Sequence, residues 1–255
     1  MIKAILFDVH GTIIDKGKDQ DKVLTSARKN VVSFLNQQGY EVTDSGYYQV
    51  WLHNLKKHRQ EWEELNEVSF YDWYRGILSD LKIDRCDEKF IDEMSEQWIA
   101  GFSASTTEIS PAKEVLTKLK NKFLLGVVSN SLGKNTRVDL TVTGFIDLFD
   151  TIITSSEVGK RKPHPFIFEF ALKRLEVKPA EAIFVGDDIY EDIYGAKQVG
   201  MKTILIANQD PLKYLSNSER ADVLAKAKIE NYKPDARIDT MGKLAELLSK
   251  ASFIS

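Results

Sequence analysis

The sequence predicts an α/β protein, with a doubly wound, Rossmann-like parallel sheet and a small all-helical second unit. Two observations lead to this prediction. From about residue 109 onward, short apolar runs alternate with helical patterns, which indicates βαβ units and a mostly parallel sheet. Residues 16–105 show helical patterns and no convincing strand. We therefore expect an α/β core formed by residues 1–15 and 106–255, and a helical domain formed by residues 16–105.

We expect the strands at apolar runs that end at a charge or at a turn residue. The first run, at residues 2–7, leads into Asp8 and the turn at Gly11 and Thr12. The other runs lie at residues 124–128, 151–154, 182–185 and 203–207.

Amphipathic patterns predict the helices of the core. They lie at residues 111–122, 163–175, 190–199 and 241–250. Ser110 precedes Pro111, and since proline is favoured at the first helical position, we expect the first helix to begin at Pro111. Residues 209–233 are longer than a usual connection, look helical at 218–228, and form either a surface addition or an interface.

Residues 16–105 are expected to form a helical insertion between the first two strands, an arrangement that creates a closable cleft. The predicted helices lie at residues 21–38, 44–65, 69–81 and 87–102. A basic run at residues 56–59, followed by acids, is typical of a solvated helix face. An aromatic stripe forms either the core of this unit or a substrate pocket, and consists of Tyr47, Tyr48, Trp51, Phe70, Tyr71, Trp73 and Tyr74.

Composition excludes several classes of protein. Hydrophobic residues make up 43% and charged residues 29%, which is too apolar for disorder and typical of a soluble globular chain. The net charge of -3 gives no electrostatic reason for binding nucleic acid or an anionic membrane. Cys86 is the single cysteine, which excludes an intrachain disulfide and favours a cytoplasmic location. The protein is expected to be a monomer or a homodimer.

Polar clusters follow several of the apolar runs. They are Asp8 with His10, Gly11 and Thr12; Ser129 with Asn130; Lys162 with Pro163; and Asp187, Asp188 and Asp192. In an open parallel sheet, ligands bind outside the carboxyl ends of the strands, so these clusters are expected to form one site. The Lys162 cluster has the weakest local context, because it lies at the start of a predicted helix.

Four sequence segments carry a resemblance to a known family. FDVHGT, VVSNS, GKRKPHPFIF and VGDDIYEDIYGAKQVG occur in this order along nearly the whole chain. They resemble the four motifs of the haloacid dehalogenase (HAD) superfamily of hydrolases. The resemblance also implies that residues 16–105 form a helical cap, because some members carry such a cap between the first and second motifs.

The resemblance implies a site for phosphoryl transfer. Asp8 would be the nucleophile that forms an aspartyl-phosphate. Ser129 and Lys162 would hold the phosphoryl oxygens, with Thr12 and Asn130 completing the phosphate-binding residues. Such transfer needs a fixed nucleophile, neutralised phosphoryl charge and a proton donor for the leaving group.

The resemblance also implies Mg²⁺ as cofactor. Asp8, the backbone carbonyl of His10 and Asp187 would hold the ion, which prefers oxygen ligands. Either Asp188 or Asp192 would complete the outer shell, while the other caps a helix. An anionic phosphate approaches Asp8 only if a cation is present, so the acidic cluster and the metal imply each other.

Two residues also have simpler explanations. Ser129 could cap the following helix instead of binding phosphate. Lys162 belongs to a basic triplet with Lys160 and Arg161, and such triplets are normally solvated surface. The proline that follows selects Lys162 as the residue matching the family motif.

His10 departs from the family pattern, because phosphatases of this family usually have aspartate two positions after the nucleophile. Imidazole titrates close to neutral pH, so it is able to protonate a leaving alkoxide and later accept a proton from water. The alternative is that His10 only fills the space. The dehalogenases of the family also lack the second aspartate, and they work without metal.

We therefore expect a Mg²⁺-dependent phosphatase of a small phosphorylated metabolite. One alternative is a metal-independent 2-haloacid dehalogenase. The other is a weakly active HAD protein that binds a phosphorylated ligand.

Overall fold

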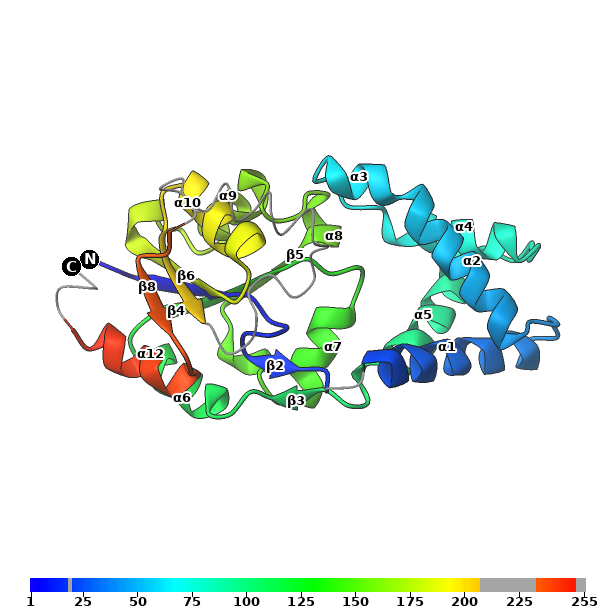
Figure 1. Cartoon of the computed structure of the whole chain (residues 1–255), viewed down its shortest axis with the longest axis horizontal. Helices are drawn as coiled ribbons and strands as arrows, with labels where there is room; N and C mark the ends of the chain where they lie inside the picture. Colours follow the sequence, from blue (N-terminus) through cyan, green and yellow to red (C-terminus); the bar gives the residue numbers. More distant parts are fainter. Residues whose placement is uncertain (18–19, 207–232, 251–255) are drawn as a thin grey trace.

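The computed structural model describes residues 1–17, 20–206 and 233–250, and its centre is a six-stranded sheet (Figure 1). The strands lie in the order β5-β4-β1-β6-β7-β8, and all neighbours are parallel. Their bounds are β1 Ala4–Phe7, β4 Leu124–Ser129, β5 Thr151–Thr154, β6 Ala182–Gly186, β7 Lys202–Ile206 and β8 Ala236–Ile238. The predicted α/β fold class is confirmed, although β8 was not expected from the sequence.

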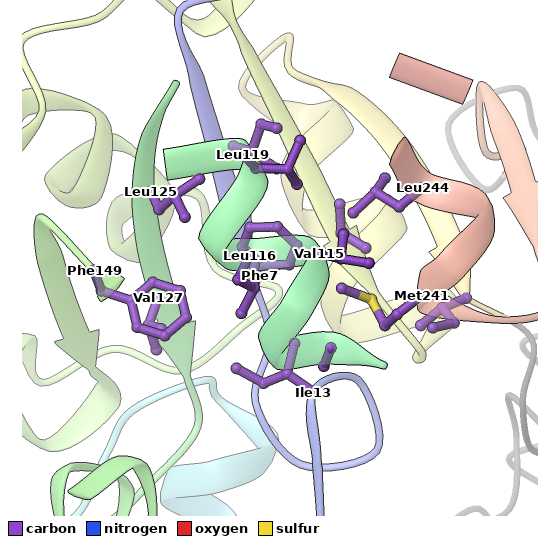
Figure 2. Packing of buried hydrophobic residues seen from close by; sticks show 14 of the residues in the cluster. Phe7, Ile13, Val115, Leu116, Leu119, Leu125, Val127, Phe149, Met241 and Leu244 are labelled. Carbon is purple, nitrogen blue, oxygen red and sulfur yellow. The ribbon is translucent and has the colours of Figure 1, made fainter. Parts of the chain in front are cut away.

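Helices cover both faces of this sheet. Ile5 and Phe7 of β1 face the layer formed by α6 (Ala112–Lys120) and α12 (Met241–Leu248), while Leu6 faces the layer containing α9 (Pro165–Arg174) and α10 (Gly195–Gln198). Because alternate residues point to opposite faces, a strand buried on both sides must be apolar throughout. Figure 2 shows the first layer, in which residues of α6 and α12 pack together with residues of the strands.

Strand order places the functional clusters at one edge. Phe7 of β1 is level with Val127 of β4 on one side and with Val185 of β6 on the other. The chain therefore leaves β1 at the point where the sheet order reverses. In doubly wound sheets, this switch point is where ligands bind.

Several core helices differ from their expected positions. α6 begins at Ala112, with Pro111 as its N-cap and no side-chain cap, so the predicted start at Pro111 is wrong by one residue. α9 begins at Pro165, because residues 162–164 form a turn instead of the first helical residues. The expected helix at 190–199 divides into η3 (Ile189–Tyr194), a π-helix, and α10.

Some short elements were not anticipated. They are α7 (Asn135–Val142), η1 (Ile146–Leu148), α8 (Ser155–Val158) and η2 (Pro179–Glu181). The helical pattern predicted at residues 218–228 lies outside the described residues. Among the described helices, none has both the length and the apolar character that crossing a membrane requires.

The insertion is helical, as expected, and forms the cap in Figure 1. Its helices are α1 Gln20–Gln37, α2 Asp44–Lys57, α3 Arg59–Glu63, α4 Phe70–Asp80 and α5 Glu88–Ser103. The single helix predicted at 44–65 is wrong. The chain leaves helical geometry at His58, whose ring packs 5.7 Å from the ring of Trp73, so tertiary packing overrides the continuous pattern.

Aromatic residues supply much of the cap interior. Tyr47, Trp73 and Tyr74 are buried in the cap core, which confirms the core interpretation for these members of the stripe. Tyr48 is exposed. α1 and α5 cross closely at Gly101, where an added Cβ would lie 2.5 Å from the Cα of Ala27.

Two short strands mark where the chain passes between core and cap. β2 (Ile14–Asp15) and β3 (Thr107–Glu108) form an antiparallel pair that the sequence did not predict. Both connections therefore run side by side at one end of the cap. The proposed domain boundaries at residues 15 and 106 stay a prediction that falls close to this pair.

Candidate active site

The carboxyl ends of β1, β4 and β6 border a cavity of about 400 Å³. Every predicted site residue except Thr12 lines it: Asp8, His10, Ser129, Asn130, Lys162, Asp187, Asp188 and Asp192. Arg161, Tyr190 and Glu191 complete the lining. Residues far apart in the sequence thus meet where the sheet order reverses.

Asp8 and Lys162 form the centre of this site. Asp8 follows β1 directly, and its backbone N–H donates to the carbonyl of Val185 at 2.9 Å. The buried Nζ of Lys162 lies 2.6 Å from Asp8 Oδ1 and 2.6 Å from Asp192 Oδ1. Burial alone would lower the pKa of Lys162, but the two carboxylates outweigh it and raise that pKa. Lys162 is therefore held as a cation between two acids.

The loop that carries Lys162 is held by Asn130. The Asn130 side chain accepts from the Lys162 N–H at 2.7 Å and donates to the Lys162 carbonyl at 3.1 Å. Both ends of this amide are thus occupied by the backbone of Lys162. These two bonds hold the backbone of Lys162 in place, whereas direct phosphate binding by Asn130 stays a prediction.

The expected acidic cluster is present. Ligand oxygens of Asp8, Asp187 and Asp192 all lie within 4.8 Å of one another, and all three residues are buried. Burial and the neighbouring carboxylates raise the pKa of Asp192, although Lys162 acts in the opposite direction. Three oxygen-bearing acids this close, with one lysine to balance them, fit a hard divalent cation such as Mg²⁺.

The turn after β1 is shaped around Asp187. Gly11 has φ of +90°, and a Cβ there would collide with the Asp187 carboxylate. Thr12 is fully buried, and its hydroxyl donates to Asp187 Oδ1 at 3.3 Å. Thr12 therefore supports the acidic cluster, and its expected place among the phosphate-binding residues stays a prediction.

Asp188 and Asp192 have different partners in this structure. Asp188 Oδ1 accepts from the N–H groups of Tyr190 and Glu191, each at 2.7 Å, and so caps η3. Asp192 accepts from the N–H of Asp188 at 3.0 Å and from Lys162. The geometry thus places Asp192 in the cluster and Asp188 at the helix cap.

His10 is held by an aspartate that sequence reasoning missed. Its Nε2 lies 2.8 Å from Oδ2 of Asp139, which is fully buried on α7. Lys16 Nζ lies 2.7 Å from the same oxygen, and Thr106 donates to the other at 3.1 Å. Burial would raise the pKa of Asp139, but His10 and Lys16 lower it to about 2. Asp139 therefore remains ionised and fixes the imidazole.

Lys16 and Thr106 adjoin the two connections between core and cap, so Asp139 contacts both connections and His10 at once. No local sequence signal marks Asp139, because its partner His10 is 129 residues away and α7 itself was not predicted.

Ser129 ends β4, and its buried side chain accepts a bond from Thr136 Oγ1 at 3.4 Å. It does not cap α7, whose N-cap is Lys134. Lys160 and Arg161 are also not freely solvated, because they bond to Asn66 and Glu67 of the cap.

Glu191 faces the cavity, and burial raises its pKa to about 7 despite the opposing effect of Lys162. Its adjacency to Asp192 was the only available sequence signal.

Comparisons with known proteins agree with this geometry. A profile described as haloacid dehalogenase-like hydrolase matches residues 5–206. The glyceraldehyde 3-phosphate phosphatase of Pyrococcus furiosus is 30% identical over 212 residues, covering 80% of this chain and 80% of the relative. A 2-haloacid dehalogenase from Pseudomonas syringae pv. Tomato gives a TM-score of 0.67 at 23% identity, covering 98% of this chain and 99% of that chain. A HAD phosphatase from Thermococcus onnurineus gives a TM-score of 0.63 at 25% identity, covering 97% and 98%.

Proposed function

Since the chain belongs to the haloacid dehalogenase-like hydrolase family, we propose that it is a Mg²⁺-dependent phosphatase of a small phosphorylated metabolite. The observation that carries this proposal is the buried arrangement of Asp8, Lys162 and the acids Asp187 and Asp192. It combines a nucleophile, a cation for the phosphoryl oxygens and a group of oxygen ligands.

In the proposed reaction, a carboxylate oxygen of Asp8 attacks the phosphorus, and the bond between phosphorus and the leaving oxygen breaks. Lys162 and the Ser129 hydroxyl bind the phosphoryl oxygens. Water then attacks the phosphorus of the aspartyl-phosphate, which releases inorganic phosphate and restores Asp8.

Asp8 and Asp187 would hold the magnesium ion, together with the backbone carbonyl of His10 and the support of Asp192. When bound, the ion neutralises negative charge between the carboxylates and the phosphoryl group. The protein's own part is to keep these oxygens close together in a buried place.

His10 is proposed to carry the proton. Its Nε2 is engaged by Asp139, which leaves Nδ1 to donate a proton to the leaving oxygen and later to accept one from water. A neighbouring carboxylate that fixes the orientation of the ring suits this task. The bond to Asp139 supports this role over mere filling of space, because a residue that only fills space needs no such partner.

The substrate is proposed to be of the size of a small sugar phosphate. The cavity of about 400 Å³ accommodates such a molecule. The relative from Pyrococcus furiosus, whose name specifies glyceraldehyde 3-phosphate, supports the same class. A cytoplasmic location and a monomeric or homodimeric state stay predictions.

The test is hydrolysis of para-nitrophenyl phosphate with Mg²⁺ and with a chelator, followed by a panel of phosphorylated metabolites. We expect release of nitrophenol that depends on Mg²⁺. A correctly folded protein without metal-stimulated release would contradict the proposal.

His10 at the position of the usual second aspartate favours a second candidate, a 2-haloacid dehalogenase. That reaction forms an ester by attack on carbon and does not require the acidic cluster. Chloride release from 2-chloropropionate that is insensitive to chelator would favour the dehalogenase over the phosphatase. Tight binding of a phosphorylated ligand without turnover would indicate a binding protein instead.

A further inference from the structure

The cap meets the core at a second place, across the cap from the β2–β3 connections (Figure 1). Residues 65–67, between α3 and α4, run antiparallel to residues 159–161. The Arg161 N–H donates to the carbonyl of Leu65 at 3.0 Å, and the Glu67 N–H donates to the carbonyl of Gly159 at 3.1 Å. This contact ends one residue before Lys162.

Glu67 is the centre of the contact. Its side chain is only 2% exposed, and Oε2 accepts from Arg161 Nη1 at 2.7 Å and from the hydroxyl of Ser155. Oε1 accepts from Trp62 Nε1 and from the N–H of Val68, each at 3.0 Å. Both oxygens of this buried carboxylate therefore have two donors, as a buried charge requires.

The partners of Glu67 lead to both phosphate-facing loops of the core. Ser155 also accepts from the N–H of Ser131 at 2.9 Å, two residues after Ser129. Arg161 lines the cavity and precedes Lys162. One cap carboxylate thus contacts the loop that follows Ser129, through Ser155, and the loop that carries Lys162, through Arg161.

We propose that Glu67 is a positioning residue, through which the docked cap holds the Ser129 and Lys162 loops in their catalytic arrangement. The inference rests on the proposed phosphatase function, which gives those two residues their task. None of the described residues within 16–105 lines the cavity, so in this proposal the cap acts by fixing core loops and not by touching the phosphoryl group.

The physical reason is that the hydrogen bonds of this contact are lost together. If the cap lifts at this edge, Glu67 loses Arg161 and Ser155 together, and Arg161 loses its carboxylate as well as the carbonyl of Leu65. The backbone around Lys162 then loses its hydrogen bond to the cap and keeps only core bonds such as those to Asn130 and to the N–H of His164. A shift of about 1 Å in a catalytic group costs on the order of a hundredfold in rate.

The test compares Glu67→Gln with the matched control Asp92→Asn. Asp92 is also a cap carboxylate that faces a core cation, with Oδ1 3.7 Å from Nζ of Lys134, but this cation lies at the start of α7 and is neither Ser155 nor Arg161, the two core partners of Glu67. Backbone hydrogen exchange at Arg161 is measured together with kcat and KM for para-nitrophenyl phosphate, at a temperature where circular dichroism shows each variant folded.

In Glu67→Gln, we expect exchange at Arg161 to accelerate about tenfold and kcat to fall about tenfold to a hundredfold, with a smaller change in KM. Asp92→Asn should keep both quantities within about twofold of wild type. Unchanged exchange, or faster exchange with unchanged kcat, would overturn the proposal. If Glu67→Gln does not fold, Ser155→Ala replaces it with the same expectations, because it removes the bridge to Ser131.

Failure of the proposed function gives a different result. In that case wild-type protein does not hydrolyse para-nitrophenyl phosphate with Mg²⁺, whatever the variants do. The exchange rate at Arg161 in Glu67→Gln then decides alone whether Glu67 positions the Lys162 loop.

Discussion

The core site and the cap use charge in opposite ways. At the core site, Lys162 and Asp192 are almost completely buried and bond to each other at 2.6 Å. On the cap, Arg59 and Glu63 bond at a similar distance, but their side chains are 73% and 62% exposed. Buried ions interact strongly and leave a large penalty when one is removed, whereas exposed pairs are screened by water. The two pairs thus differ in their surroundings: the charges at the candidate site are buried together, whereas this pair on the cap is exposed to solvent.

Two buried carboxylates bond to residues of both the core and the cap or its connections. Asp139 connects His10 with Lys16 and Thr106 beside the cap connections, and Glu67 enters the core from the cap. Both are fully or almost fully buried carboxylates. These two carboxylates are therefore places where residues beside the candidate site and residues of the cap or its connections bond to the same group.

Asp8→Asn would show most directly that the chemistry belongs to the core. The amide keeps the shape of the side chain but is not a nucleophile, so we expect activity to fall by at least about 10⁴-fold. Circular dichroism should show a folded protein. Residual hydrolysis above a few per cent of wild type would mean that Asp8 is not the nucleophile.

Asp187→Asn tests the acidic cluster. Losing one of its three carboxylates should reduce Mg²⁺-dependent activity by about 10²- to 10³-fold. Mg²⁺ at a hundred times its dissociation constant should stabilise wild type by about 2.7 kcal/mol, because the ion binds only the folded chain. Thermal melts with and without Mg²⁺ measure this. The same stabilisation in Asp187→Asn would place the ion elsewhere.

Asp139→Asn tests the boundary between core and cap. We expect kcat to fall about tenfold to a hundredfold, because His10 loses the carboxylate that orients it. The pKa of Asp139 in the folded protein, about 2, lies below its ordinary value of 3.8. The ionised form therefore stabilises wild type above about pH 4, by about 2 kcal/mol, and this contribution disappears as the pH falls toward 2.

Urea unfolding at pH 7 and at pH 3 checks the second expectation for Asp139→Asn. The gap in the free energy of unfolding between wild type and variant should be wide at pH 7 and should narrow at pH 3. A gap that stays constant with pH would contradict the assigned ionisation.

Arg59→Ala should have the smallest effect. Its pair with Glu63 is exposed, so the free energy of unfolding should change by less than about 0.5 kcal/mol and kcat should remain at the wild-type value. Urea unfolding and the phosphatase assay measure both. A large loss of activity would mean that this face of the cap binds substrate.

Features that depend on neighbouring residues in the sequence could be predicted. Asp8, Ser129 and Asp187 each follow an apolar run directly, so local pattern placed them at one edge of the sheet, and the structure brings them together there. The cap helices followed from amphipathic spacing and cap residues such as Asp87, which accepts from the N–H of Phe90. Each of these signals involves residues that are only a few positions apart in the sequence.

The contacts between regions were not predictable in this way. Glu67 finds Ser155 at a separation of 88 residues, and Asp139 finds His10 at 129. Nothing in the local pattern of either acid distinguishes it from a solvated one. The break at His58 was missed for a similar reason, because its cause is packing against Trp73.

The position of β1 in the sheet has a consequence for the order of assembly during synthesis. β1 leaves the ribosome before the cap, whereas its partners β4 and β6 begin at Leu124 and Ala182, after the whole cap has been made. The cap is contiguous in sequence, so all of its helices are available to pack together before β1 can pair with β4, and contacts closer in sequence form faster than distant ones. A nascent chain that ends before Asp192 lacks part of the acidic cluster, so the candidate site cannot form until the segment after β6 has been synthesised.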